Sequence, residues 1–188
     1  LRVAIEKKHL FSFIFWGPPG VGKTTLAKIY AHALDAELYE LSAVSAGKDD
    51  IKKILKDNAH IKHRVFNVGQ PKVLFLDEIH RFNKAQQDFL LPFVESGQLT
   101  LIGATTENPS FEVISPLLSR CRVFVLNELS NLEMAKIIDR TGLRLNKESK
   151  EWLINMANGD ARQAIGLLEA TQNLYGSTSS PSRGESRD

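Results

Sequence analysis

One short segment, residues 17–25, constrains the fold of this chain more than any other. Its sequence, GPPGVGKTT, fits the pattern G-x-x-x-x-G-K-[ST], in which backbone N–H groups and a helix N-terminus surround a phosphate. The apolar residues 11–16 before it predict a buried strand, and residues 26–34 after it have apolar side chains at helical spacing. A strand, a glycine-rich turn and a helix start are the context that this chemistry requires. A glycine-proline turn that merely precedes a helix is the alternative.

Each residue type in this segment suits phosphate binding. Glycine has no Cβ, so the glycines allow the backbone to close around a phosphate. Lys23 is expected to reach the β- and γ-phosphates of a nucleotide, and the Thr24 hydroxyl is expected to ligate Mg²⁺. The expected nucleotide-binding residues are Gly17, Pro18, Pro19, Gly20, Val21, Gly22, Lys23, Thr24 and Thr25.

The composition is that of an ordinary globular protein, with 43% hydrophobic and 24% charged residues. A formal net charge of +2 does not by itself indicate a nucleic-acid-binding protein, although a pI near 8.7 permits one. The single cysteine, Cys121, excludes a disulfide framework or a cysteine metal cluster and favours a reducing, intracellular setting. No apolar run approaches the roughly 18 residues of a membrane span, and no secretory signal is recognisable.

Strand and helix patterns alternate along the chain as far as residue 126. This alternation predicts an α/β fold with a five-stranded parallel sheet between helices. The expected strands are 11–16, 37–41, 72–77, 99–105 and 122–126, and the expected long helices between them are 26–34, 49–60 and 83–95. Pro109 and Pro116 are expected to interrupt a loop, with a short helix at 117–120. The polar stretch 60–70 is interpreted as a solvated basic loop, although a nucleic-acid contact is the alternative.

Only helical patterns follow residue 126. Ser130 and Glu133 form a capping box that begins one helix, and residues 146–157 and 160–174 predict two more. Residues 176–188 are rich in Ser, Gly, Pro and charge. We therefore expect a phosphate-loop NTPase domain at 1–127, a small helical lid subdomain at 128–175 and a disordered tail at 176–188.

Two carboxylates stand at the end of the third predicted strand. Asp77 and Glu78 come directly after the apolar run 73–76, at the edge of the sheet where open α/β sheets bind ligands. We expect Asp77 to hold Mg²⁺ through water, and Glu78 to orient and deprotonate an attacking water. Helix-capping carboxylates are the alternative. His80 is more typical of one structural hydrogen bond than of catalysis.

Hydroxyl side chains end the fourth predicted strand, at Thr105 and Thr106. Either hydroxyl could bond the γ-phosphate or the attacking water, and we take Thr106 as the catalytic candidate, although Thr is common in strands.

Two arginines are further candidates. Arg162 lies in the first turn of a predicted helix, where a cation opposes the helix dipole and favours a compensating anion. That anion is either a phosphate or a neighbouring carboxylate, Asp160 or Glu169. Arg120 alone would indicate only a surface residue, pairing with Glu112 or Glu128.

Taken in order, these motifs resemble those of the AAA+ ATPases, and specifically the clamp-loader branch. GPPGVGKTT, LFLDEIH, the threonine pair, residues 119–121 and residues 159–162 match its Walker A, Walker B, sensor 1, arginine-finger and sensor 2 motifs. Residues 80–88 and 102–112 further resemble the replication-associated recombination protein A family, which is related to the Werner-helicase-interacting ATPase of eukaryotes. The resemblance spans residues 10–174.

This resemblance implies DNA-stimulated hydrolysis of ATP with Mg²⁺ at stalled replication forks. The implied partners are single-stranded or forked DNA, single-strand-binding protein and further copies of the chain, with no membrane. It places Arg162 on the nucleotide and Arg120 on the nucleotide of the neighbouring subunit. The implied location is the cytoplasm, at the nucleoid, in a bacterium and the nucleus in a eukaryote. Because the family carries an oligomerisation region C-terminal to the part that residues 10–174 match, we expect this core alone to be a weak, monomeric ATPase.

Two other functions are compatible with the sequence. One is an ATP-regulated scaffold with little turnover, against which Glu78 and Arg120 argue. The other is a small-molecule phosphotransferase, because such kinases share phosphate loops. That class would need an acceptor pocket in place of the helical subdomain.

Overall fold

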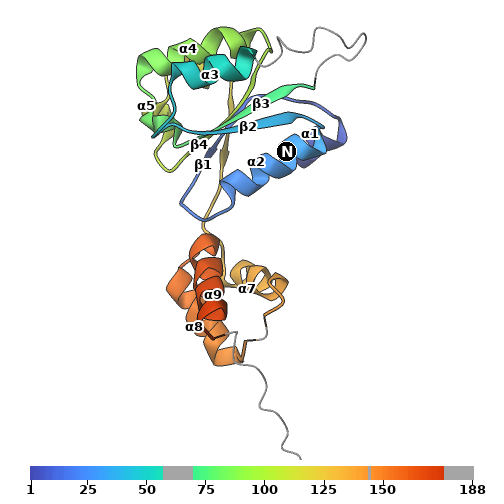
Figure 1. The fold of residues 1–188 in the computed structure, drawn as a ribbon, viewed down its shortest axis with the longest axis vertical. Coiled ribbons are helices and arrows are strands. Elements are labelled where there is room, and N and C mark those ends of the chain that lie inside the picture. Colours follow the sequence, from blue (N-terminus) through green and yellow to red (C-terminus); the bar gives the residue numbers. More distant parts are fainter. Residues whose placement is uncertain (57–69, 144, 176–188) are drawn as a thin grey trace, which may run out of the picture. The chain divides into compact units, whose positions relative to one another are not determined.

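The computed structural model describes residues 1–56, 70–143 and 145–175, and the chain divides into two compact units. Unit 1 comprises Leu1–Asn127 and contains a sheet with helices on both faces, and unit 2 comprises Glu128–Asp188 and is helical where it is described (Figure 1). Residues 57–69, most of the predicted polar stretch, and the predicted tail 176–188 lie outside the described residues.

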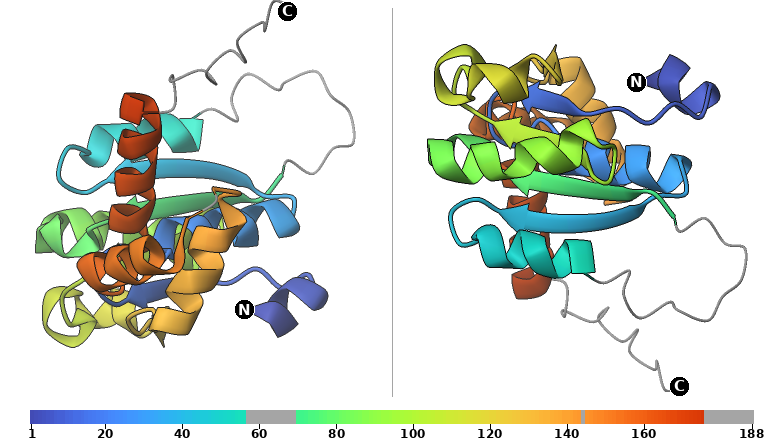
Figure 2. Two further views of the ribbon diagram at one scale, coloured as in Figure 1. Left: turned by 90° about the horizontal axis from the view of Figure 1, so that it is seen from below. Right: turned by 90° about the horizontal axis from the view of Figure 1, so that it is seen from above.

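All the strands of unit 1 run parallel in one sheet. Its order is β2-β3-β4-β1-β5, and the first four lie side by side in Figure 2. The strands are β1 (Phe13–Trp16), β2 (Glu37–Ser42), β3 (Lys72–Asp77), β4 (Thr100–Thr105) and β5 (Arg122–Val125). The predicted five-stranded parallel sheet is therefore confirmed. Because β4 lies between β3 and β1, the ends of these three strands meet at one edge of the sheet.

Strand β1 begins two residues later than the sequence predicts. At residues 11 and 12, hydrogen bonds to side-chain hydroxyls take the place of hydrogen bonds between strand backbones. The Phe11 N–H donates to the Tyr30 hydroxyl at 3.2 Å, and the Leu101 N–H donates to the Ser12 hydroxyl oxygen at 2.9 Å. These groups satisfy hydrogen bonds that a longer strand would otherwise make.

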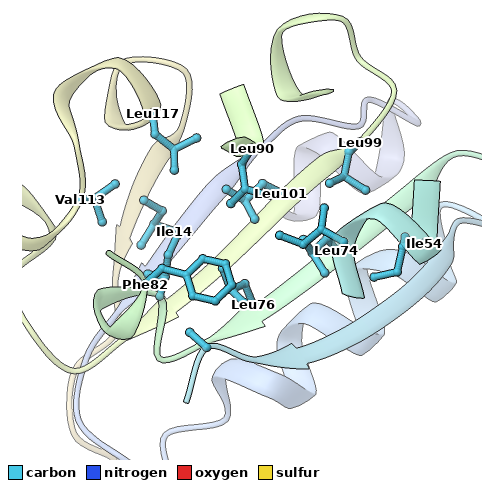
Figure 3. Close-up of a cluster of buried hydrophobic side chains, with 13 residues drawn as sticks. Ile14, Ile54, Leu74, Leu76, Phe82, Leu90, Leu99, Leu101, Val113 and Leu117 are labelled. Atoms are coloured by element: carbon cyan, nitrogen blue, oxygen red, sulfur yellow. The ribbon is translucent and has the colours of Figure 1, made fainter. Parts of the chain in front are cut away.

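The two faces of the sheet carry separate hydrophobic clusters, because alternate side chains of a strand point to opposite faces. Phe13 and Phe15 pack on the face of α2 (Lys23–Ala33), whereas Ile14 faces α3 (Lys48–Lys56) and α4 (Lys84–Glu95). Figure 3 shows buried members of the second cluster, which include Ile14, Ile54, Leu74, Leu76, Phe82, Leu90, Leu99, Leu101, Val113 and Leu117.

The segment between β4 and β5 differs from the sequence prediction. In place of a loop with one short helix at 117–120, it contains two short helices, α5 (Pro109–Glu112) and α6 (Ser115–Leu118). Each carries its proline in the first turn, where a missing N–H costs nothing. The Asn108 side chain caps α5 by accepting from the Ser110 N–H at 3.0 Å.

Unit 2 contains α7 (Asn131–Arg140), α8 (Lys147–Ala157) and α9 (Ala161–Tyr175). The predicted capping box is confirmed at the start of α7, where Ser130 accepts from the Glu133 N–H and the Glu133 carboxylate accepts from the Ser130 N–H. The buried side chains of the unit form their own cluster, which contains Met134, Ile138, Leu153, Ile154, Ala157, Ala164 and Leu168. No helix that the structure describes is both long and apolar enough to cross a membrane.

Gln87 on α4 joins this helix to the segment that carries α5 and α6. Its amide nitrogen donates to the carbonyl oxygens of Phe82 and Glu112, each at 2.9 Å, and its amide oxygen accepts from the Ile114 N–H at 2.9 Å. The residue is 1% exposed, so water cannot replace these partners. Gln87 therefore links the segment that follows Glu78, at Phe82, to the segment that precedes Arg120, at Glu112 and Ile114.

We expect Gln87→Met to destabilise the chain by about 1 to 3 kcal/mol, because methionine fills a similar space but leaves buried backbone groups without partners. Urea unfolding followed by circular dichroism measures this. The matched control is Asp88→Asn on the exposed side of the same helix, with a change within about 0.5 kcal/mol. Equal stability of the two variants would contradict the role given to Gln87.

Candidate functional site

The loop between β1 and α2 has the backbone conformation that anion binding requires. Gly20 and Gly22 have φ angles of 71° and 93°, a left-handed region that glycine adopts without strain. Gly22 is the N-cap of α2 and makes no side-chain cap, so the first-turn N–H groups can donate to an anion. Helix α2 begins at Lys23, three residues before the predicted start, because Gly22 turns the chain directly into the helix.

The Lys23 ammonium lies inside this loop. Its Nζ donates to the carbonyl oxygens of Gly17 at 2.7 Å and Pro18 at 2.8 Å, and the residue is only 8% exposed. A buried cation beside a helix N-terminus attracts negative charge strongly, because both contributions have the same sign. These residues therefore fit the phosphates of a nucleotide.

Gly17 has a different physical role from the one that the sequence suggests. A Cβ atom added to it would lie 2.2 Å from the Leu126 carbonyl oxygen, and its φ is not in the left-handed region. The Leu126 N–H donates to the Trp16 carbonyl oxygen at 2.7 Å, which holds the chain after β5 against the loop. Position 17 must therefore be glycine because Leu126 approaches it so closely. Nothing in the sequence pattern predicts this long-range contact.

Asp77 and Glu78 occupy the predicted edge of the sheet. Asp77 is the last residue of β3, and its Oδ1 accepts from the Glu78 N–H at 3.1 Å. Glu78 has φ 55° and ψ 43°, a left-handed conformation that costs an L-residue about 1 to 2 kcal/mol. This turn directs the chain from β3 into a short 3₁₀ helix, η2 (Ile79–Arg81). Such strain at a non-glycine residue is typical of functional sites.

Thr105 connects the phosphate loop to the segment after β3. Its carbonyl oxygen accepts from the Gly17 N–H at 3.2 Å, and its hydroxyl oxygen accepts from the Glu107 N–H at 2.9 Å. The hydroxyl also lies 3.0 Å from Nδ1 of His80. Thr105 is fully buried, whereas Thr106 is partly exposed. The catalytic role of Thr106 stays a prediction.

His80 makes two side-chain contacts, where the sequence favoured one structural hydrogen bond. Besides Thr105, its ring contacts Glu78, with 3.1 Å between Nε2 and the Glu78 Oε2 atom. The His80 side chain is 8% exposed and that of Glu78 is 33% exposed. The sequence places His80 two residues after Glu78, but the pairing with Thr105 depends on the alignment of two strands.

Arg120 pairs with a carboxylate that the sequence did not suggest. Its Nη2 lies 2.7 Å from the Glu95 Oε1 atom at the end of α4, and its Nη1 donates to the Pro116 carbonyl oxygen at 2.6 Å. The partner within unit 1 is therefore Glu95, whereas the sequence offered Glu112 or Glu128 as partners of a surface arginine. Burial raises the pKa of the neighbouring Cys121 thiol to about 12, so this cysteine is not a nucleophile at neutral pH.

Arg162 belongs to unit 2. It is exposed in the first turn of α9, and the Asp160 Oδ1 atom accepts from the Gln163 N–H at 3.1 Å. Asp160 therefore caps this helix, and the contact between Arg162 and a nucleotide stays a prediction.

Within the described ranges, no group of three or more His, Cys, Asp or Glu side chains could hold a metal ion. Mg²⁺ in phosphate sites needs only one or two protein ligands, because water and phosphate oxygens complete its shell. Thr24 and Asp77 supply oxygen atoms of the right kind, and they are the residues that would hold the ion.

Comparisons with known proteins show what the chain is similar to. The family model for the ATPase family associated with various cellular activities (AAA) matches residues 13–129. The chain is 44% identical to the replication-associated recombination protein A of Escherichia coli strain K12, over 88% of this chain and 39% of that protein. It is 45% identical to the ATPase WRNIP1 of Dictyostelium discoideum, over 90% of this chain and 20% of that protein. The chain thus spans about two fifths or less of the length of these relatives.

Among solved structures, the chain is similar to the RuvB Holliday junction branch migration motor of Thermotoga maritima. The TM-score is 0.72 at 28% sequence identity, and the match covers 94% of this chain and 59% of RuvB.

We expect Gly17→Ala to destabilise the chain by about 3 kcal/mol, because the added Cβ meets backbone that cannot move without distorting the loop. The control is Gly47→Ala, where an added Cβ has nothing within 4 Å, with a change below about 1 kcal/mol. Urea unfolding compares the two variants. If the two alanines cost the same, the contact with Leu126 does not constrain this position.

Proposed function

The chain belongs to the AAA ATPase family, and from this premise we propose that it hydrolyses ATP with Mg²⁺ and couples hydrolysis to work on DNA at stalled replication forks. We further propose that it is a motor of the clamp-loader type. One observation carries the first step: Thr105 bonds the phosphate loop through Gly17 and the segment of Glu78 through His80. The groups that suit phosphate binding and proton transfer are thereby held at one edge of the sheet.

Each residue of the site has a defined part in the proposed reaction. The loop N–H groups and the Lys23 ammonium would bind the phosphates. Thr24 and Asp77 would hold Mg²⁺, which would supply positive charge to offset the charge of the phosphates. Glu78 accepts a proton from the attacking water, so its carboxylate must face the γ-phosphate. Phosphoryl transfer needs little covalent assistance, and positioning with electrostatic stabilisation therefore carries the catalysis.

The names of the relatives support action on DNA. One relative is a replication-associated recombination protein, and the similar structure is a Holliday junction branch migration motor. We propose single-stranded or forked DNA and single-strand-binding protein as partners, and a homo-oligomer as the active form. Within this proposal, unit 2 is the lid over the nucleotide and Arg162 is its contact.

We expect Lys23→Ala to lower ATP affinity at least tenfold, because it removes the cation that offsets the phosphate charge. Glu78→Gln should bind ATP as the wild type does and lose hydrolysis, since an amide cannot accept the proton of water. Calorimetric ATP binding and phosphate release, with and without forked DNA, measure both. The control Glu37→Gln makes the same change at the amino end of β2 and should leave turnover unchanged.

The two alternatives give other outcomes in this experiment. A scaffold would bind ATP with negligible turnover even on DNA, and a phosphotransferase would release little phosphate without an acceptor. Wild-type turnover in Glu78→Gln would contradict Glu78 as the base.

We also propose that Arg120 acts on the nucleotide of a neighbouring copy. Its side chain is 39% exposed and that of Glu95 is 47% exposed. Exposed ion pairs contribute only about 0 to 1 kcal/mol, so exchanging Glu95 for a phosphate costs little. An arginine on the transferred phosphate contributes on the order of 10³ to 10⁵ in rate. The gain therefore outweighs the loss of the resting pair.

In a full-length protein that carries the family's C-terminal oligomerisation region, assembled on forked DNA, we expect Arg120→Ala to retain ATP binding and lose DNA-stimulated hydrolysis. Mixing it with Lys23→Ala subunits should restore part of the activity, because hybrid interfaces join an intact arginine to an intact phosphate loop. Glu95→Gln is the matched control and should keep its activity. An inactive Arg120→Ala that mixing does not rescue, despite proven subunit exchange, would contradict action between subunits.

A further inference from the structure

His80 lies between the candidate base and the strand that borders the phosphate loop. Nε2 of its ring is 3.1 Å from the Glu78 Oε2 atom, and Nδ1 is 3.0 Å from the Thr105 hydroxyl oxygen. Its side chain is 8% exposed, so water does not compete freely for either nitrogen. Both nitrogens of one nearly buried ring are thus used, and each contacts a different residue of the site.

The chemistry of these groups assigns a direction to the hydrogen bonds. An ionised carboxylate can only accept hydrogen bonds. The Nε2 atom of His80 therefore carries a hydrogen and donates a hydrogen bond to the Glu78 carboxylate. In the neutral ring, Nδ1 then accepts, and the Thr105 hydroxyl donates to it. That hydroxyl has one proton and two acceptors in reach, His80 Nδ1 at 3.0 Å and the Glu107 carbonyl oxygen at 3.2 Å. The shorter contact and the need of Nδ1 for a donor favour His80.

The same hydroxyl oxygen accepts from the Glu107 N–H at 2.9 Å, which holds it in place. The donors then run in one direction, from the backbone at Glu107 through Thr105 and His80 to the carboxylate of Glu78. The Thr105 carbonyl oxygen also accepts from the Gly17 N–H at 3.2 Å. The series therefore passes through a residue, Thr105, that is itself bonded to the phosphate loop.

Glu78 needs such a restraint more than an ordinary glutamate does. Its side chain is 33% exposed and its backbone is left-handed, so the regular structure of β3 does not orient it. A glutamate with free side-chain rotamers would point at an attacking water only part of the time. His80 bonds Oε2, and Oε1 is then available to accept a proton.

We propose that His80 is a positioning residue, which orients the Glu78 carboxylate and links its orientation to the end of β4 through Thr105. This inference rests on the proposed ATP hydrolysis, because it assigns a partner to the base of that reaction. His80 does not itself touch the reacting phosphate.

Two substitutions separate this role from simple packing. In His80→Gln, the terminal amide can take the place of Nε2 and donate to Glu78. In His80→Asn, the shorter amide takes the place of Nδ1 and keeps the contact with Thr105, but it does not reach Glu78. Both remove the ring, so a packing role predicts similar defects in the two variants.

We expect His80→Asn to lower kcat at least tenfold with ATP affinity within threefold of the wild type. His80→Gln should recover kcat to within about threefold of the wild type. Thr105→Val, which keeps the shape and removes the hydroxyl, should lower kcat less than His80→Asn does. Unchanged turnover in His80→Asn, or equal defects in His80→Gln and His80→Asn, would overturn the proposal.

A spectroscopic measurement tests the same hydrogen bonds without reference to turnover. Nitrogen NMR of this chain distinguishes the two neutral tautomers of each of its five histidines, and the His80→Asn variant identifies the His80 signals. We expect His80 to carry its proton on Nε2 at neutral pH, and Glu78→Ala to remove this preference. A proton on Nδ1 in the wild type would overturn the proposal.

The two proposals fail in different ways. Loss of turnover in Glu78→Gln with full turnover in His80→Asn rejects the role of His80 and leaves ATP hydrolysis intact. If the wild-type protein shows no turnover, the proposed function is rejected. The tautomer of His80 then still shows whether its hydrogen bonds to Glu78 and Thr105 exist.

Discussion

The hydrogen bonds of Thr105 hold the candidate site together. The residue ends β4, the strand between β3 and β1, and it is fully buried. Its carbonyl oxygen bonds the phosphate loop, and its hydroxyl bonds His80 and the backbone at Glu107. A change in the register of β4 would move all these partners at once, because the strand alternates its side chains between the two faces of the sheet.

At the edge of the sheet that carries the candidate site, two positions have a backbone conformation or a close packing that most residue types would not fit. Gly17 accepts the close approach of Leu126, and Glu78 adopts a left-handed backbone without being glycine. Such features persist only where the surroundings hold them, and in this protein the parallel strands supply that rigidity. The carboxylates therefore sit on a short turn that is anchored on a rigid sheet, at the edge that also carries the phosphate loop.

Burial separates the permanent contacts of this region from the exchangeable ones. Gln87 is almost fully buried and has three backbone partners, so removing its amide would leave polar groups without water. Arg120 and Glu95 are both partly exposed, and their pair can open at small cost. Helix α4 thus carries a structural contact near its start and a replaceable one at its end.

The sequence by itself determined the local elements and the type of site. The segment GPPGVGKTT, the apolar run before Asp77 and the capping box at Ser130 are short-range patterns. The strand that ends at Asp77 and the capping box lie where the sequence predicts them, and the glycine-rich segment joins a strand to a helix that begins three residues early. Only the tertiary structure decided that Gly17 is needed for Leu126, that His80 joins Glu78 to Thr105, and that Arg120 pairs with Glu95. Apart from the contact between His80 and Glu78, these contacts join residues that are distant in sequence. They depend on which strands are neighbours and in what register, and hydrophobic periodicity within one element carries no information about either.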